Sequence, residues 1–137
     1  NHFSSLFAKE TICETYEVLD DILIVLQNES EVRNYQPNFE LMKSFKYGGI
    51  IVTAQGQNYD FVSRYFCPRE GINEDPVTGS AHCKLIDYWS KHLNKNEFKA
   101  FQASHRGGEL FVKINNDRAL ISGHAIITAA GEFYDSI

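Results

Sequence analysis

The chain has 137 residues and a formal net charge of −5, with 43% hydrophobic and 23% charged residues. That length suits one domain of ordinary size, and the negative charge argues against binding to the phosphate backbone of nucleic acids. No apolar stretch is long enough to span a bilayer and no signal-peptide pattern opens the sequence, so we expect a soluble protein that does not engage a membrane.

The predicted elements are mostly strands. Short apolar or alternating runs, bounded by turn residues, predict strands at 21–27, 49–55, 59–66, 99–103, 109–114, 118–122 and 125–130. The polar segment 28–38 is too short to be a linker between domains. A surface helix is expected at 37–45, with Pro37 or Asn38 at its start. We therefore treat residues 1–137 as a single domain.

A second, longer helix is predicted at 80–93. It is apolar around most of its circumference, and its polar residues Lys84, Asp87 and Lys91 form one narrow stripe at helical spacing. Such a helix should be mostly buried, so we expect the strands to form a β-barrel-like sheet that wraps around it. The sequence thus predicts an α+β fold with a central helix.

The segment 71–82, just before and into this helix, carries the residues best suited to chemistry. Asp75 precedes Pro76 and is therefore expected in an extended backbone. In such a backbone the neighbouring side chains of Glu74 and Asp75 point to opposite sides, so only one carboxylate can face a site. We assign that role to Asp75. The simpler alternative is a solvated acidic turn.

The start of the helix is expected to bind an anion. Thr78 or Ser80 can cap the first turn. Gly79 has no Cβ and lets a ligand approach the backbone N–H groups of residues 79–81, the last of them on Ala81. The helix dipole adds roughly 0.3–1 kcal/mol for a charge placed there, or about 2 kcal/mol in a partly buried site. That orients a substrate carboxylate but does not catalyse a reaction. His82 fits equally well as a residue lining the site and as a core histidine.

The cysteines and histidines do not suggest a metal site. Cys13, Cys67 and Cys83 lack paired or metal-ligand spacing, which argues against a disulfide framework or a zinc site and indicates a reducing compartment. We expect a cytoplasmic protein in which all three thiols are small buried hydrophobic groups.

Arg106 precedes two glycines and has two interpretations. Its guanidinium group could clamp a substrate acid through two hydrogen bonds. We prefer the commoner explanation, in which Arg106-Gly107-Gly108 belongs to a hairpin connection between Ala103 and Leu110, with glycine supplying a positive φ.

The part of the chain beyond Gly49 contains a series of distinctive strings. They are Asp60-Phe61-Val62-Ser63-Arg64-Tyr65-Phe66, Pro68, Glu74-Asp75-Pro76-Val77-Thr78-Gly79-Ser80-Ala81-His82, Tyr88-Trp89, Gln102-Ala103-Ser104, Arg106-Gly107-Gly108 and Gly123. In this order and spacing they resemble the phenazine biosynthesis protein family, whose members are relatives of diaminopimelate epimerase. The first 48 residues contribute little to the resemblance.

The resemblance implies a two-domain enzyme with the diaminopimelate epimerase-like fold. In such enzymes each half is a β-barrel-like sheet around a central helix, and the active site lies in the cleft between the halves. This chain resembles the C-terminal half only. The N-terminal domain, which carries the general acid/base glutamate of the family, is absent from the sequence and is the expected partner of this chain.

The resemblance also implies the reaction and the residues of the site. It places the family's aspartate on Asp75 and its serine on Ser80, with Gly79 allowing close approach to the backbone. The implied reaction is a cofactor-independent isomerisation by proton shift, in which Asp75 holds or helps to protonate a small amino-acid-like or carboxylic acid substrate. The expected substrate-binding residues are Thr78, Gly79, Ser80, Ala81 and His82. Diaminopimelate epimerase and proline racemase use paired cysteine thiols, so Asp75 argues against a two-thiol racemase.

Two other functions remain open from the sequence. The chain could be a non-catalytic module that uses the same turn to hold a metabolite or a partner. A hot-dog-type acyl-thioester hydrolase also wraps a sheet around a helix, but the Thr-Gly-Ser turn and the Asp-Pro step match the isomerase pattern better. If the N-terminal domain is absent, the apolar face on which it would pack should be exposed, so we expect a homodimer or a tendency to aggregate.

Overall fold

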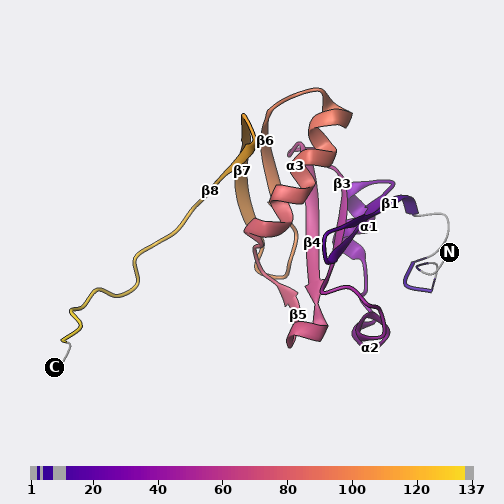
Figure 1. Ribbon diagram of the computed structural model, residues 1–137, viewed down its shortest axis with the longest axis horizontal. Helices are drawn as coiled ribbons and strands as arrows, with labels where there is room; N and C mark the ends of the chain where they lie inside the picture. Colours follow the sequence, from indigo (N-terminus) through magenta and orange to yellow (C-terminus); the bar gives the residue numbers. More distant parts are fainter. Residues whose placement is uncertain (1–2, 4, 8–11, 135–137) are drawn as a thin grey trace.

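A mixed sheet of eight strands organises the described part of the chain, residues 3, 5–7 and 12–134 of a computed structural model (Figure 1). The strand order is β1-β2-β3-β4-β6-β7-β8, and β5 pairs with β4 beside this path. The strands are β1 (Ile12–Val18), β2 (Asp21–Leu26), β3 (Gly49–Gln55), β4 (Phe61–Cys67), β5 (Ile72–Asp75), β6 (Glu97–Gln102), β7 (Gly108–Asn115) and β8 (Arg118–Gly123). The helices are α1 (Glu29–Asn34), α2 (Phe39–Lys43) and α3 (Gly79–Leu93), with a 3-10 turn at Pro68–Glu70.

Two parallel strand pairs explain where the helices lie. β2 pairs with β3 and β4 with β6 in parallel, whereas the other neighbours are antiparallel. Parallel neighbours need a crossover connection. The first crossover runs through α1 and α2, and the second runs through β5 and α3.

The two crossovers cover opposite faces of the sheet. Ile22 and Ile24 of β2 pack in one apolar cluster with Val32 of α1 and Met42 of α2. Leu23, between them, belongs to a second cluster with the buried side chains of α3. Since successive strand residues point to opposite faces, β2 and β3 are covered on both sides, and this explains their unbroken apolar sequences.

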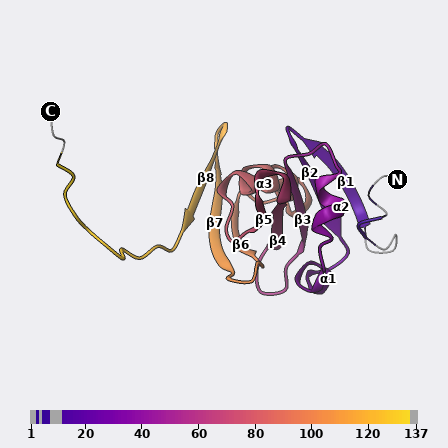
Figure 2. The same ribbon diagram turned by 90° about the horizontal axis from the view of Figure 1, so that it is seen from below.

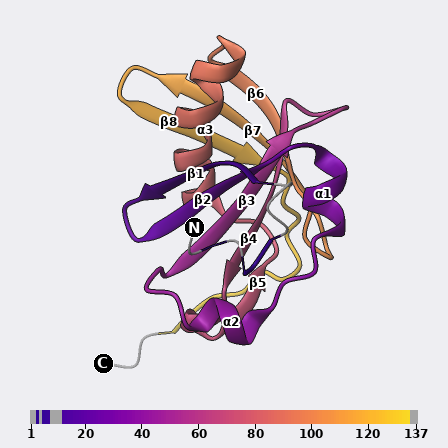
Figure 3. The ribbon, with the colours of Figure 1, turned by 90° about the vertical axis from the view of Figure 1, so that its right-hand side faces the viewer.

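The sheet curves around α3, so that β1 and β2 lie on one side of this helix and β7 and β8 on the other (Figure 2). Trp89 of α3 stacks on Phe61 of β4, with ring centroids 5.7 Å apart and planes 5° apart. Tyr88 contacts Tyr16 of β1, with ring centroids 5.7 Å apart. Strand β1 crosses in front of α3 in Figure 3. The expected α+β fold, a barrel-like sheet around a central helix, is confirmed.

Six of the seven predicted strands and both predicted helices are present, with ends shifted by a few residues. α2 is shorter than expected, and Asn38 caps it by accepting a hydrogen bond from the Leu41 amide. The segment 28–38, interpreted as a polar loop, contains α1. Its N-cap is Asn28, but it buries only Val32 and so has no apolar periodicity that would reveal it.

The predicted strand at 125–130 is wrong. Residues 124–134, which we call the extended tail, have no regular secondary structure, and every residue in the tail is exposed. The tail leaves β8 and runs away from the sheet (Figure 1). A strand needs a neighbour for its backbone hydrogen bonds, and among the described residues no strand pairs with this segment.

Two strands were missed by sequence analysis. β1 carries Glu14, Thr15 and Glu17 and has no buried residue, because it lies at an edge of the sheet. β5 has only four residues and runs directly into Pro76. Neither strand has the apolar pattern by which a strand is recognised in a sequence.

The predicted burial of the cysteines is confirmed only for Cys67. Cys13 and Cys83 are exposed, because Cys13 lies on the edge strand β1 and Cys83 lies on the side of α3 that the sheet leaves uncovered. In the described part of the chain, no helix combines the length and the apolar character needed to cross a lipid bilayer.

Candidate functional site

The turn between β5 and α3 is held in place by Gln102 at the end of β6. The fully buried Gln102 side chain accepts a hydrogen bond from the Thr78 amide (2.8 Å) through Oε1. Its Nε2 donates to the Asp75 carbonyl (2.7 Å) and to the Thr78 hydroxyl (3.0 Å). These bonds fix both ends of the four-residue turn. Sequence analysis included Gln102 only as part of the family resemblance, since a partner 24 residues away leaves no local signal.

Thr78 occupies the N-cap position of α3 but does not cap the helix with its side chain. Its hydroxyl instead donates to Asp75 Oδ2 (2.6 Å). The predicted cap by the Thr78 side chain is absent, because the hydroxyl oxygen, which would have to accept from a first-turn N–H group, accepts from Gln102 Nε2 instead. The first N–H groups of α3 have no intrahelical partner by geometry, and they point out of the turn next to a carboxylate held in a fixed position.

Gly79 and Ser80 leave the helix N-terminus open. Both are exposed, and a Cβ atom added to Gly79 would meet no atom within 4 Å. A ligand can therefore approach the backbone here. Among the described residues, the second carboxylate oxygen of Asp75, Oδ1, has no hydrogen-bond partner and is free to accept one.

Glu74 points away from this site. Its carboxylate makes two hydrogen bonds to the Arg64 guanidinium, from Nε to Oε1 (2.7 Å) and from Nη2 to Oε2 (3.0 Å). Arg64 also donates to the carbonyl of Tyr35, just after α1 (2.7 Å). The expected division of the two neighbouring carboxylates is confirmed, and Glu74 has a structural role.

The connection between β6 and β7 packs directly on the same turn. The Ser104 hydroxyl donates to the Pro76 carbonyl (2.8 Å) and accepts from the Gly107 amide (3.1 Å). A Cβ atom on Gly108 would collide with Cγ2 of Val77. The hairpin interpretation is confirmed, since β6 and β7 pair antiparallel and Gly107 has a φ of 72°.

The same hairpin brings Arg106 close to the helix N-terminus. Arg106 and Gly79 line one hollow of about 560 Å³, together with His124 at the start of the tail. Within the described chain the Arg106 guanidinium makes no hydrogen bond or ion pair, and the side chain is exposed. The two interpretations of Arg106 are thus compatible, because a hairpin residue can also present a free positive charge beside the turn.

Ala81 and His82 point into the core. Ala81 is 1% exposed and His82 is 0% exposed, and the His82 ring stacks on Phe61 with centroids 6.0 Å apart. Nδ1 of His82 lies 2.7 Å from the Thr78 carbonyl, so this nitrogen carries the proton and the ring supports the turn from behind. Burial lowers the pKa of His82 and keeps the ring neutral. Of the two alternatives left open for His82, the structure shows the core position.

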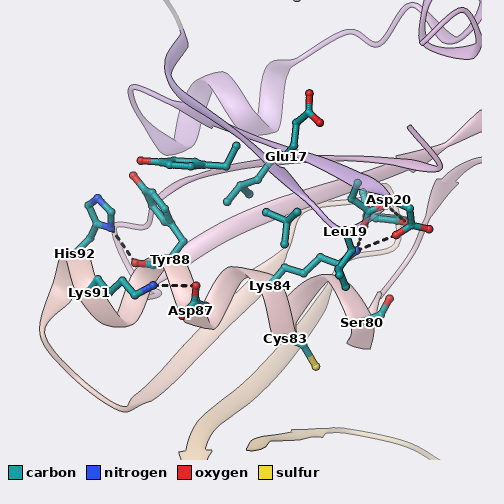
Figure 4. A pocket seen from close by; sticks show the side chains of 15 residues that line it. Glu17, Leu19, Asp20, Ser80, Cys83, Lys84, Asp87, Tyr88, Lys91 and His92 are labelled. Atoms are coloured by element: carbon teal, nitrogen blue, oxygen red, sulfur yellow. Dashed lines mark hydrogen bonds and ion pairs between the residues drawn. The ribbon is translucent and has the colours of Figure 1, made fainter. Parts of the chain in front are cut away.

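A second hollow, of about 910 Å³, lies between α3 and the β1–β2 hairpin (Figure 4). Ser80 and Cys83 line it, as does Lys84, whose Nζ is 2.5 Å from Asp21 Oδ2. Ser80 thus lines the hollow on this side of the helix, whereas Gly79 lines the hollow on the side of Arg106. Asp75 lines neither hollow. The predicted site residues are therefore divided between two sides of one helix N-terminus.

Cys67 is buried at the end of β4, which pairs with β5. Burial, and to a lesser degree the negative charge of Asp75, raise the pKa of its thiol. A thiol with a raised pKa stays protonated at neutral pH and is a poor base or nucleophile. In the described residues no cluster of three or more His, Cys, Asp or Glu side chains is arranged to hold a metal ion.

Comparison with known proteins decides the family. Residues 4–131 match the model of the family described as phenazine biosynthesis-like protein. The chain belongs to the phenazine biosynthesis-like family. It is 48% identical over 112 residues to an uncharacterized isomerase of Pseudomonas aeruginosa, in a match that covers 82% of this chain and 43% of that protein. An uncharacterized isomerase of Halalkalibacterium halodurans is also 48% identical, over 114 residues and with the same shares.

The fold of this family member matches solved structures of the same family. The crystal structure of a phenazine biosynthesis protein from Enterococcus faecalis superposes with a TM-score of 0.88 at 42% identity. The match covers 97% of this chain and 51% of that one. The chain thus spans about half the length of the relatives that it matches.

The hydrogen bonds of Thr78 give the first prediction. Thr78→Ala removes the hydroxyl that links Asp75 and Gln102 and should lower the free energy of unfolding by about 1–3 kcal/mol, since it leaves a buried amide without one partner. Thr78→Ser keeps the hydroxyl and should cost less than about 1 kcal/mol, the value of one buried methyl group. Urea denaturation measures both, and equal losses would contradict a role for the hydroxyl.

The lowered pKa of His82 predicts a pH dependence of stability. Below about pH 6.5 the unfolded chain binds a proton at this ring that the folded chain does not. The contribution of His82 to the free energy of unfolding should therefore be constant above that pH and fall as the pH is lowered below it, by at most about 1.4 kcal/mol per pH unit. His82→Gln should abolish this slope, whereas His105→Gln, at an exposed position, should retain it. If the free energy of unfolding of His82→Gln still fell with pH in this range, the pH dependence would belong to another group.

Proposed function

We propose that this chain forms one side of the active-site cleft of a cofactor-independent isomerase, which shifts a proton on a small amino-acid-like or carboxylic acid substrate. Two relatives that are 48% identical to the chain are named as isomerases. One observation carries the proposal: the first turn of α3 has no side-chain cap, and the fixed carboxylate of Asp75 lies beside it.

The amide groups at the start of α3 bind the carboxylate of the substrate. A helix N-terminus combines N–H donors with the positive end of the helix dipole, and the open space at Gly79 admits the ligand. Arg106 adds a positive charge on one side of this position. The Ser80 side chain contacts the substrate from the other side.

Asp75 acts on the reacting part of the substrate. The Thr78 hydroxyl engages Oδ2, which holds the carboxylate in one orientation and leaves Oδ1 to accept or return a proton. Pre-positioning of this kind is how a general acid or base contributes to catalysis, typically by 10²- to 10⁴-fold. The buried His82 takes no part in the proton transfer and supports the turn.

The opposite side of the cleft comes from the domain that this chain does not contain. The chain spans 43% of the two bacterial relatives, and by the family resemblance the second acid/base group, a glutamate, lies in the other half. An isomerase needs one group to remove the proton and another to return it. This chain alone therefore has no turnover, although its turn can still hold an anion.

Replacement of Asp75 tests the proposal. In a full-length protein that contains this sequence, Asp75→Asn keeps the hydrogen bond with Thr78 but cannot take up a proton, so kcat should fall about 10²-fold or more. The readout is exchange of the substrate C–H proton with deuterium from the solvent. Asp117→Asn, in the exposed turn between β7 and β8, is the control and should keep wild-type exchange. If Asp75→Asn exchanged the substrate proton as fast as the wild type, Asp75 would have only a structural role in the turn. If the wild-type protein bound the substrate without exchanging its proton, the non-catalytic binding module would be favoured.

Gly79→Ala separates binding from stability. The added methyl group meets no protein atom, so the free energy of unfolding should stay equal or rise by about 0.4–1 kcal/mol. The methyl group nevertheless lies over the amides that bind the substrate, and KM should rise by about tenfold or more. Ser90→Ala, near the other end of α3, serves as the control for changes in helix stability. An unchanged KM in Gly79→Ala would place the substrate elsewhere.

A further inference from the structure

The strand β5, which leads into the turn, is held only weakly by its own backbone and packing. It has four residues, none of which is buried. Among the described strands it pairs with β4 alone, and the register is irregular between its two aligned positions, at Ile72 and Asp75. A short segment of this kind opens readily, because few hydrogen bonds and little buried apolar area oppose its opening. The position of β5 therefore depends on contacts made by side chains.

Glu74 supplies one such contact. Its carboxylate is bound by both arms of the Arg64 guanidinium, and the two side chains are only 17% and 10% exposed. Arg64 is itself fixed, since it donates to the Tyr35 carbonyl and its Cζ atom lies 4.9 Å from the centroid of the Phe66 ring. A planar fork that binds a carboxylate through two hydrogen bonds sets both its distance and its rotation. The Arg64–Glu74 pair therefore locks β5 to the central strand β4.

This pair and Gln102 hold the turn from opposite faces of the sheet. Arg64 lies two residues before Phe66, which belongs to the apolar cluster that packs on α1 and α2. Gln102 lies two residues after Ala100, which belongs to the cluster around α3. Since alternate residues of a strand point to the same face, the two contacts act from the two sides of the sheet. The end of β5 is thus clamped between them.

The direction of Asp75 depends on this clamp. Glu74 and Asp75 are neighbours on one extended strand, so their side chains point to opposite sides. A rotation of β5 that moved Glu74 off its partner would turn the Asp75 carboxylate away from the Thr78 hydroxyl, to which it is bonded. Gln102 holds the backbone carbonyl of Asp75 and not its carboxylate. The rotation of the side chain is therefore controlled from the face of the sheet that lies away from the site.

We propose that Arg64 and Glu74 are positioning residues of the proposed isomerase: their ion pair fixes the rotation of β5 and thereby aims the Asp75 carboxylate at the reacting atom, without contact between the pair and the substrate. This inference rests on the proposed function and adds the control of its proton-transfer step. The start of α3 is held separately, by the bond from the Thr78 amide to Gln102. The pair therefore governs kcat and has little influence on KM.

The first test is Glu74→Gln in a full-length protein that contains this sequence. The variant side chain has the size of the wild-type one, but its amide group can accept only one of the two hydrogen bonds from Arg64. The kcat of substrate proton exchange should fall about tenfold or more, since a displacement of about 1 Å can cost about 10²-fold. The change in KM should stay below about twofold, as for an interaction that acts on the transition state.

Arg64→Lys gives an independent variant. It keeps the buried positive charge, and with it a partner for Glu74, but loses the fork that sets the rotation of the carboxylate. It should lower kcat without raising KM, as Glu74→Gln does. Because the two residues act as one unit, the double variant should lose little more than either single variant.

Glu29→Gln is the matched control. It breaks another ion pair between a glutamate and an arginine, Glu29–Arg33 in α1, in which the Glu29 side chain is 11% exposed. It should keep the wild-type kcat even where its melting temperature falls as much as that of Glu74→Gln. A wild-type kcat in Glu74→Gln, or a rise of KM without a fall of kcat, would overturn the proposal.

A measurement without substrate separates this inference from the proposed reaction. Nε2 of Gln102 donates to the Asp75 carbonyl and to the Thr78 hydroxyl, so its protons exchange slowly with solvent, as seen by NMR, while β5 stays in place. Their exchange should be about tenfold faster or more in Glu74→Gln and unchanged in Glu29→Gln and Asp75→Asn. Slow exchange in Glu74→Gln would overturn the clamp, whereas wild-type turnover in Asp75→Asn would overturn the proposed function. The two failures therefore appear in different measurements.

Discussion

The buried amide of Gln102 is the interaction on which the site depends. It replaces the hydrogen bonds that water would make to the backbone at both ends of the turn, at Asp75 and at Thr78. In a water-free interior such bonds are strong, and leaving one of them unmade is costly. Gln102 is the last residue of β6, which is fixed by β4 and β7. The position of the turn between β5 and α3 is therefore set by the sheet and not by the local sequence.

This arrangement explains how one helix start remains available to a ligand. In most helices a Ser, Thr, Asp or Asn side chain occupies the first N–H groups. Here the Thr78 side chain turns back to Asp75, and the His82 ring supports the Thr78 carbonyl from inside the core. The protein thus keeps a threonine at the N-cap and still leaves the amides uncapped. Asp75 gains a fixed orientation from the same hydrogen bond.

The sequence could predict the features that depend on local patterns. Most strands and α3 follow from apolar periodicity, and the opposed directions of Glu74 and Asp75 follow from the extended backbone before Pro76. Gln102 and the place of Arg106 could not be predicted, because they depend on strand pairing between distant segments. The strand expected at 125–130 has an apolar sequence, but in the structure this segment is exposed and has no regular secondary structure. An apolar run predicts a strand only where a neighbouring strand is present to pair with it.

The close packing of Gly108 against Val77 limits which substitutions the β6–β7 connection can accept. Any side chain at position 108 would displace Val77, and Val77 lies between Asp75 and the start of α3. The volumes at these two positions are therefore coupled across the hairpin and the turn. A side chain added at position 108, far along the chain from Asp75, would shift the Asp75 carboxylate unless the side chain at position 77 became smaller at the same time.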